Sequence, residues 1–155
     1  RKPYLEISNM DLQHVINTNV LSIHNLCKAC IPYMLKNGCG RIINISSILG
    51  EIALPDLAGY NISKGALNSL TQSIAIEFAE KNITVNGIAP GFCKTSYYDS
   101  FKENKKLHEE VLTRIPMKRW GESSEIIGIC DFLLSDSAQY ITGTTIPVDG
   151  GWLAC

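Results

Sequence analysis

Short apolar runs alternate with long amphipathic stretches along this 155-residue chain. Residues 42–45 form a nearly continuous apolar run, which is typical of a parallel strand covered on both faces. We expect the next strand at 83–88 and a last one at 144–148, where Pro147 favours an edge position. Helices are expected at 9–37, 58–80 and 122–135. This order of strands and helices with short turns predicts an α/β fold built on a parallel sheet.

The helix expected at 9–37 contains apolar residues spaced three and four positions apart, and Gly38 suits its end. Pro32 removes one helical hydrogen bond and predicts a kink. Asn19 falls on the apolar side of this helix, where an amide needs a partner. One interpretation is that this amide caps a backbone carbonyl freed by the kink.

Composition limits the functions open to the chain. With 45% hydrophobic and 19% charged residues it resembles an ordinary globular protein, and we expect a single domain over 1–155. A net charge of -1 gives no electrostatic reason to expect nucleic acid or an acidic membrane as a partner. No apolar run could span a bilayer. Cys27 and Cys30 lack a second cluster at ligand spacing, so we expect no metal site and reduced thiols in a cytoplasmic protein.

The strongest chemical signal is Ser47, which follows an apolar strand, together with Tyr60 and Lys64 on the next helix. Spacing of four residues places the phenol and the ammonium on one helical face. A nearby cation favours the phenolate, so Tyr60 is interpreted as an acid/base and Ser47 as a partner for a substrate oxygen. The alternative is a surface Tyr and Lys on an ordinary amphipathic helix.

Several motifs in a fixed order resemble the short-chain dehydrogenase/reductase family: NTN at 17–19, GRIINISS at 40–47, YNISK at 60–64, NITVNGIAPGF at 82–92, Thr95, RWG at 119–121 and ITG…PVDGGW at 141–152. The resemblance implies that Tyr60 is the catalytic acid/base and Lys64 its pKa-lowering partner. It implies that Ser47, rather than Ser46, orients the reacting oxygen. Asn19 would hold a water that links Lys64 to solvent.

The same resemblance implies a nicotinamide cofactor, NAD or NADP. Tyr60 and Lys64 would contact it, with Lys64 hydrogen-bonded to the nicotinamide ribose. The turn at Pro90 and Gly91, the backbone at Cys93 and the Thr95 hydroxyl would meet the carboxamide end. Relatives carry a substrate lid near residues 96–120, so Tyr97, Tyr98 and Phe101 are expected to close over a substrate, with a solvated charged helix at 102–110.

The chain lacks the glycine-rich turn that follows the first strand in this family and binds the cofactor phosphates. Gly38-Cys39-Gly40 precedes a strand instead, and is interpreted as a helix stop. The sequence is therefore expected to be the C-terminal part of a doubly wound, Rossmann-type parallel sheet, without its N-terminal phosphate-binding half. The 155 residues alone are expected to be inactive.

The expected function is an NAD(P)-dependent oxidoreductase that interconverts a small-molecule carbonyl and a secondary alcohol by hydride transfer. IPMKRWGESSEI…DGGW resembles gluconate 5-dehydrogenases and other sugar-acid or polyol enzymes, whereas PGF and SSDSAQYITG resemble 3-oxoacyl-carrier-protein reductases. A carrier protein would need a basic patch, which Lys94, Lys102, Lys105 and Lys106 could supply. A non-catalytic oligomerisation or partner-binding module is the alternative of another class. Relatives imply a homodimer or homotetramer formed through the helices at 9–37 and 58–80.

Overall fold

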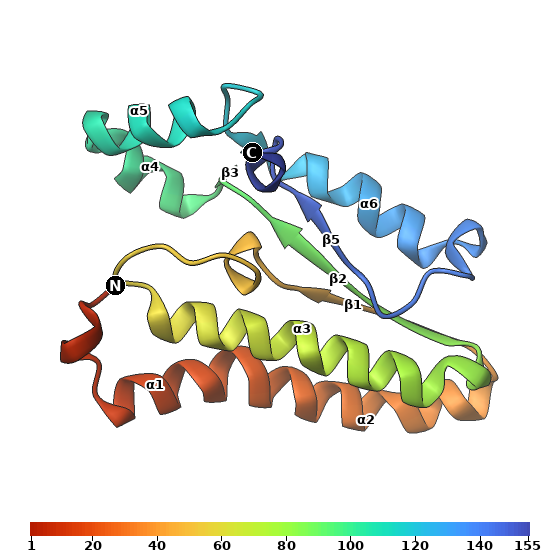
Figure 1. Ribbon diagram of the computed structural model, residues 1–155. Helices are drawn as coiled ribbons and strands as arrows, with labels where there is room; N and C mark the ends of the chain where they lie inside the picture. Colours follow the sequence, from red (N-terminus) through yellow and green to blue (C-terminus); the bar gives the residue numbers. More distant parts are fainter.

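Three parallel strands form the central sheet of the computed structural model, in the order β1-β2-β5 (Figure 1). The structure describes the backbone of residues 1–155 and every side chain except those of Tyr97 and Ser100. The strands are β1 (Gly40–Ile45), β2 (Ile83–Pro90) and β5 (Thr145–Val148). β2 lies between the other two and is buried from Ile83 to Ala89. β5 is an edge strand of this described sheet, as Pro147 predicts.

Helices cover both faces of the sheet (Figure 1). α1 (Asn9–Ile16), α2 (Ser22–Asn37) and α3 (Ala58–Phe78) lie on one face, and α6 (Ser124–Leu134) lies on the other. The core under the first face contains Cys27, Ile31, Ala75, Ile83 and Val85. The core under α6 is built around Ile88, Leu133 and Ala138. The predicted α/β fold with a parallel sheet is confirmed.

The helix expected at 9–37 is present, but a π turn at Asn17–Leu21 separates α1 from α2. In that turn the Ser22 N–H donates to the carbonyl of Asn17, five residues back. Ser8 begins the helix, because its hydroxyl accepts from the Asp11 N–H while the Asp11 carboxylate accepts from the Ser8 N–H. Gly38 ends it in a left-handed conformation with φ of 73°. Single π turns are rare and often mark functional sites.

β2 extends two residues beyond its predicted end, because Ala89 and Pro90 pair with Pro147 and Val148. A short parallel pair follows, formed by β3 (Cys93–Lys94) and β4 (Gly121–Glu122), which the sequence did not predict.

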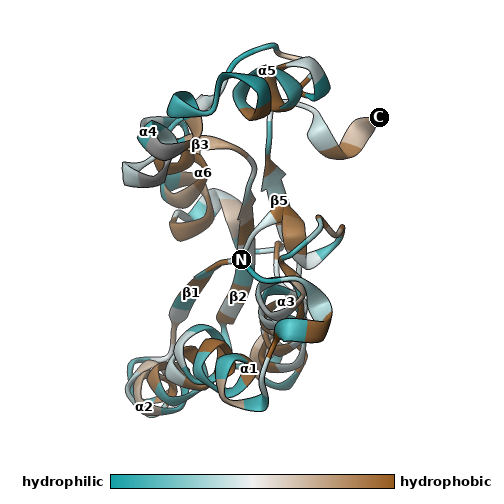
Figure 2. Cartoon of the chain, turned by 90° about the vertical axis from the view of Figure 1, so that its left-hand side faces the viewer, coloured by the Kyte–Doolittle hydropathy of each residue, from teal (hydrophilic) through white to brown (hydrophobic). Residues whose placement is uncertain are grey.

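The single charged helix predicted at 102–110 is wrong in its bounds. The structure has two helices here, α4 (Ser96–Glu103) and α5 (Lys105–Arg114). They separate at Asn104, because its side chain accepts a hydrogen bond of 3.2 Å from the Leu107 N–H and caps α5. Figure 2 shows α4 and α5 at the opposite side of the molecule from α1 and α2.

Candidate active site

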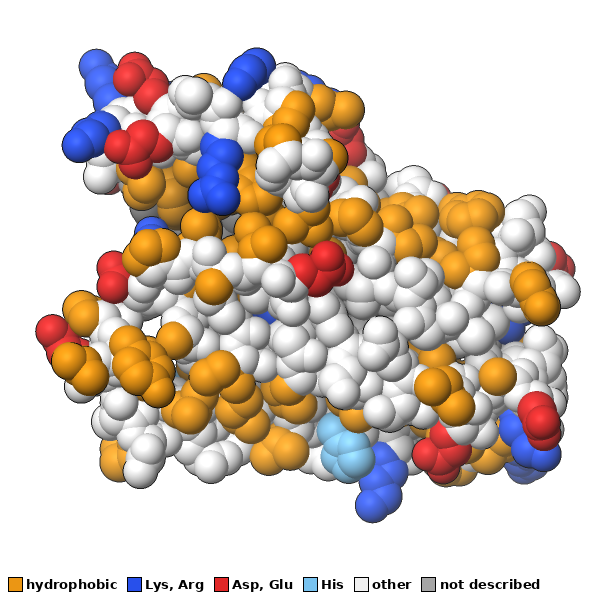
Figure 3. All heavy atoms as spheres, viewed as in Figure 1, with side chains coloured by type: hydrophobic (Ala, Val, Ile, Leu, Met, Phe, Trp, Pro, Cys, Tyr) orange, Lys and Arg blue, Asp and Glu red, His pale blue; other side chains and the backbone are white. Residues whose placement is uncertain are grey.

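A cleft of about 1170 Å³ lies between α1 and the α4–α5 pair. Hydrophobic side chains gather along the hollow in Figure 3. Ser47 follows β1, Pro90 and Gly91 lie at the end of β2, and Tyr60 lies in the first turn of α3. These four residues line the cleft together with Cys93 and Thr95. In parallel α/β sheets, ligands bind outside the carboxyl ends of the strands, where this cleft lies.

Lys64 lies one turn after Tyr60 on α3 and is not among the residues that line the cleft. Its Nζ is 5.6 Å from the centroid of the Tyr60 ring and donates a 2.8 Å hydrogen bond to the carbonyl of Ile45, at the end of β1. Burial lowers the pKa of the Lys64 ammonium. The Tyr60 hydroxyl makes no hydrogen bond to any residue that the structure describes. Tyr60 lines the cleft, and its hydroxyl keeps its donor and acceptor capacity available to a ligand.

Ser47, and not Ser46, lines the cleft. The Ser47 Oγ accepts a 3.2 Å hydrogen bond from the Leu49 N–H in the short turn Ile48–Gly50, which leaves the hydroxyl proton for another partner. The Ser46 hydroxyl instead donates to the side-chain oxygen of Asn68 on α3. Two adjacent serines thus have different surroundings, and one of them is in a position to meet a ligand.

Asn19 does not line the cleft but connects to Tyr60 through Ser63. The Asn19 Nδ2 donates a 3.0 Å hydrogen bond to the Ser63 Oγ, and that hydroxyl donates a 2.7 Å bond to the backbone carbonyl of Tyr60. The interpretation that the Asn19 amide caps a backbone carbonyl is wrong, because the partner is a side chain. Sequence reasoning missed Ser63, which is fully buried three residues after Tyr60.

An aromatic cluster forms the wall opposite α1. Phe92 contacts Trp120 and Trp152, with ring centroids 5.2 and 4.9 Å apart, and both indoles are about 5% exposed. Tyr98 and Phe101, two of the three predicted lid aromatics, also line the cleft. Tyr97 lies outside the described side chains.

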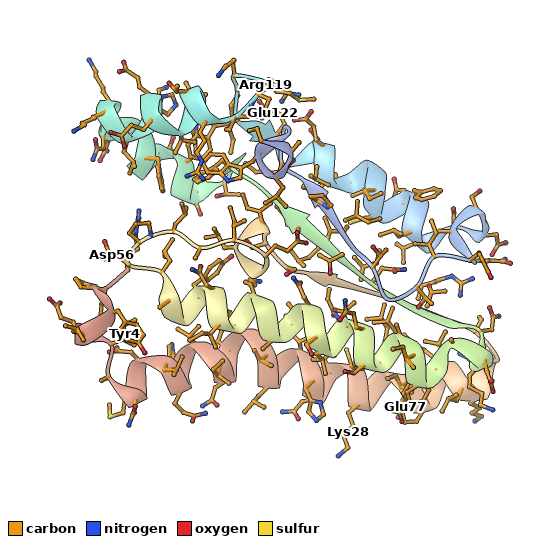
Figure 4. All side chains as sticks on the ribbon, viewed as in Figure 1. Tyr4, Lys28, Asp56, Glu77, Arg119 and Glu122 are labelled. Atoms are coloured by element: carbon orange, nitrogen blue, oxygen red, sulfur yellow. The ribbon has the colours of Figure 1, made fainter. Side chains whose placement is uncertain are left out.

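Two ion pairs hold the β3–β4 segment beside this wall. Arg119 contacts Glu125 through two hydrogen bonds of 2.8 and 2.7 Å, and Lys94 pairs with Glu122. Figure 4 shows Arg119 and Glu122 close together at this end of the molecule. The Arg119 guanidinium, together with the Glu122 N–H, lowers the pKa of Glu125 to about 2.

The chain matches a family model described as enoyl-(acyl carrier protein) reductase over residues 1–153. It is 42% identical, over 92% of its length, to 2-dehydro-3-deoxy-D-gluconate 5-dehydrogenase of Bacillus subtilis. The chain belongs to the short-chain dehydrogenase/reductase family. It is also 39% identical, over 95% of its length, to a 3-oxoacyl-[acyl-carrier-protein] reductase of Staphylococcus aureus. The match covers 56% and 59% of these two relatives, respectively.

Among solved members of the short-chain dehydrogenase/reductase family, the fold resembles a gluconate 5-dehydrogenase from Burkholderia cenocepacia in complex with NADP and tartrate. The TM-score is 0.97 at 31% identity, covering 100% of this chain and 61% of that one. Within the described residues, no helix combines the length and apolar character needed to cross a membrane. All six cysteines are free thiols.

Proposed function

We propose that this chain forms the catalytic part of an NAD(P)-dependent oxidoreductase that interconverts a carbonyl and a secondary alcohol by hydride transfer. The observation that carries the proposal is that Tyr60 lines the cleft with Ser47, and that the Lys64 cation lies 5.6 Å from the centroid of the Tyr60 ring. A phenol without a protein partner, next to a cation, is suited to exchange a proton with a substrate.

Each residue has a distinct role in this proposal. Tyr60 gives a proton to the carbonyl oxygen or takes one from the alcohol. Lys64 stabilises the phenolate form of Tyr60, and the Ser47 hydroxyl donates a hydrogen bond to the same substrate oxygen without losing its proton. Asn19 supports the site through Ser63, which fixes the backbone of Tyr60. We also propose that Asn19 holds a water molecule that links Lys64 to solvent.

The residues at the end of β2 fit a nicotinamide. Pro90, Gly91, Cys93 and Thr95 line the cleft beside the free hydroxyl of Tyr60. The Lys64 ammonium has three N–H groups, of which the Ile45 carbonyl accepts one. NAD or NADP bound there would supply or accept the hydride at the nicotinamide ring.

A sugar acid or polyol is the substrate class that we favour, in line with the printed name of the Bacillus subtilis relative. A carrier-protein substrate is the second candidate, supported by the Staphylococcus aureus relative. The basic patch that such a carrier protein would contact is less positive than the sequence suggests, because the charge of Lys94 is paired with that of Glu122.

Assembly into a homodimer or homotetramer is also proposed, with residues 1–155 as a single domain of a cytoplasmic enzyme. The helices that cover one sheet face expose large apolar side chains, namely Leu26 (63% exposed), Tyr33 (72%) and Ile76 (81%). Exposed apolar surface of this kind commonly marks an interface.

The test uses the protein made from the complete open reading frame. Oxidation of NADH or NADPH is followed by the loss of absorbance of the reduced nicotinamide, in the presence of keto acids, ketoses and a 3-oxoacyl thioester. Binding of each cofactor is measured separately by calorimetry. We expect cofactor binding and turnover of at least one carbonyl class. A protein that assembles normally but neither binds nor oxidises either cofactor would support the non-catalytic module.

A further inference from the structure

Arg114 occupies an unusual position at the end of α5. It lines the same cleft as Tyr60, and its guanidinium carbon lies 4.7 Å from the centroid of the Trp152 ring. Trp152 itself is only 4% exposed, so the indole is a fixed support. A guanidinium stacked on an aromatic face is held in orientation while its N–H edges stay available.

No carboxylate among the described residues pairs with Arg114. By contrast, Arg119 pairs with Glu125 at 2.7 Å, and Arg41 lies 3.9 Å from Asp136. Glu110 precedes Arg114 by one helical turn and also lines the cleft, yet the two form no ion pair. Arg114 is therefore an exposed cation without an acidic partner in the part of the chain that the structure describes, and it lies in a cleft that contains the proposed acid/base.

The other cations on the cleft wall are already engaged. Lys2 pairs with Asp11 at 2.8 Å, and the Arg1 guanidinium donates to the carbonyl of Pro55. The wall around Arg114 is otherwise largely apolar, with Leu107, Val111 and Trp120 as neighbours on the same lining. Because Arg114 is exposed, a ligand anion would be held mainly by directed hydrogen bonds from the guanidinium, and the apolar side chains would pack against the rest of the ligand.

We propose that Arg114 binds the carboxylate of the substrate and so selects sugar acids over polyols. Arginine matches a carboxylate with two parallel N–H···O bonds, a geometry that a neutral hydroxymethyl group cannot reproduce. The inference rests on the proposed dehydrogenase function and names the group by which that site recognises its substrate.

D-Gluconate and D-glucitol test this directly, because they differ only in having a carboxylate or a hydroxymethyl group at one end. We compare kcat/KM for the two in the oxidation direction, and measure binding of each by calorimetry as a readout independent of turnover. A second pair, 4-oxopentanoate and its amide, repeats the comparison in the reduction direction. The variant is Arg114→Met, which keeps an apolar stem over Trp152.

The control is Lys28→Gln, which removes a positive charge at an exposed position of α2 outside the cleft. We expect the natural enzyme to prefer the acid in at least one pair. Arg114→Met should raise KM for that acid roughly 10- to 100-fold, with little change in kcat or in KM for the neutral compound. Lys28→Gln should keep the preference for the acid.

Several results would overturn the inference. An acid preference that is equal in Arg114→Met and in the natural enzyme would show that another group holds the carboxylate, while leaving the dehydrogenase function intact. Equal use of acid and neutral compound by the natural enzyme, or turnover confined to 3-oxoacyl thioesters, would also overturn the inference, because the carboxylate would then not be recognised. Both results would leave the dehydrogenase function intact. If neither pair is turned over, loss of D-gluconate binding in Arg114→Met alone supports the anion site, and absence of that binding in the natural enzyme rejects it.

Discussion

The side-chain amide of Asn19 donates to the hydroxyl of Ser63 at 3.0 Å, and this bond joins the π turn of the first long helix to α3. Because the same hydroxyl donates to the carbonyl of Tyr60, the position of the proposed acid/base depends on a residue 41 positions away, Asn19, through one buried serine.

Ser63→Ala should therefore lower both stability and turnover. The variant leaves the half-buried Asn19 donor without its partner, and the cost should lie at or below the value of about 1–3 kcal/mol for a fully buried polar group. Urea unfolding should show this loss, and kcat should fall more than KM rises. Ser69→Ala, at an exposed position of the same helix, is the control. Equal behaviour of the two variants would show that the connection has no energetic importance.

Tyr60→Phe should reduce kcat by at least about 100-fold, the scale of a lost general acid/base. The affinity for the nicotinamide cofactor should change far less, because only one hydroxyl is removed. Steady-state kinetics and calorimetry measure the two effects. Tyr33→Phe, at an exposed position on α2, should retain full activity. Near-natural turnover of Tyr60→Phe would reject the assignment of Tyr60.

The pH dependence of turnover should reflect Lys64. Burial lowers the pKa of this ammonium, so its charge is lost at a lower pH than that of a free lysine, about 10.4. If the cation is required, turnover should fall as pH rises through the lowered pKa. Lys64→Arg keeps a positive charge throughout this range, so its alkaline decline should move to higher pH. The control is Lys28→Arg on the exposed side of α2 (Figure 4). An unchanged alkaline limb in Lys64→Arg would exclude Lys64 as the titrating group.

Glu125→Gln should change how stability depends on pH. The pKa of Glu125 is held at about 2 in the folded protein, below the value of about 4.3 expected in the unfolded chain. The stabilisation is therefore complete above about pH 4.3 and is lost as pH falls towards 2. Denaturant midpoints of the natural protein and Glu125→Gln should differ at pH 7 and converge near pH 2. A constant difference across this range would contradict the prediction.

Ile76→Glu should weaken assembly, because it places a charge on an exposed apolar side chain of α3. Light scattering at micromolar concentration should show a smaller species than the natural protein forms. Gln72→Glu, one turn earlier and exposed, adds the same charge without removing an apolar group and serves as the control. A monomeric natural protein would remove the proposal of assembly.

Local patterns predicted the elements of this fold well and their interruptions poorly. Apolar spacing located the helix at 9–37, but spacings of three and four also accommodate one extra residue, so the π turn was invisible. The charged run at 102–110 has little apolar periodicity, and its division at Asn104 depends on a single side-chain cap.

The candidate site follows the same division. The structure brings to one cleft six residues that were predicted from motifs: Ser47, Tyr60, Pro90, Gly91, Cys93 and Thr95. Ser63 and Arg114 were not, because their importance depends on neighbours from distant segments, the amide of Asn19 and the indole of Trp152.

The π turn also sets how the residues of α1 are rotated about the helix axis relative to those of α2. Each residue of an α-helix advances the chain by about 100°, so the extra residue fixes which side of α1 faces α3. In this phase the Leu12 side chain lies against Gly59, where a methyl group would be 3.8 Å from its Cδ1. Deleting one residue between Asn17 and Leu21 would turn Leu12 away from α3, and would thereby change the lining of the cleft, to which both Leu12 and Gly59 belong.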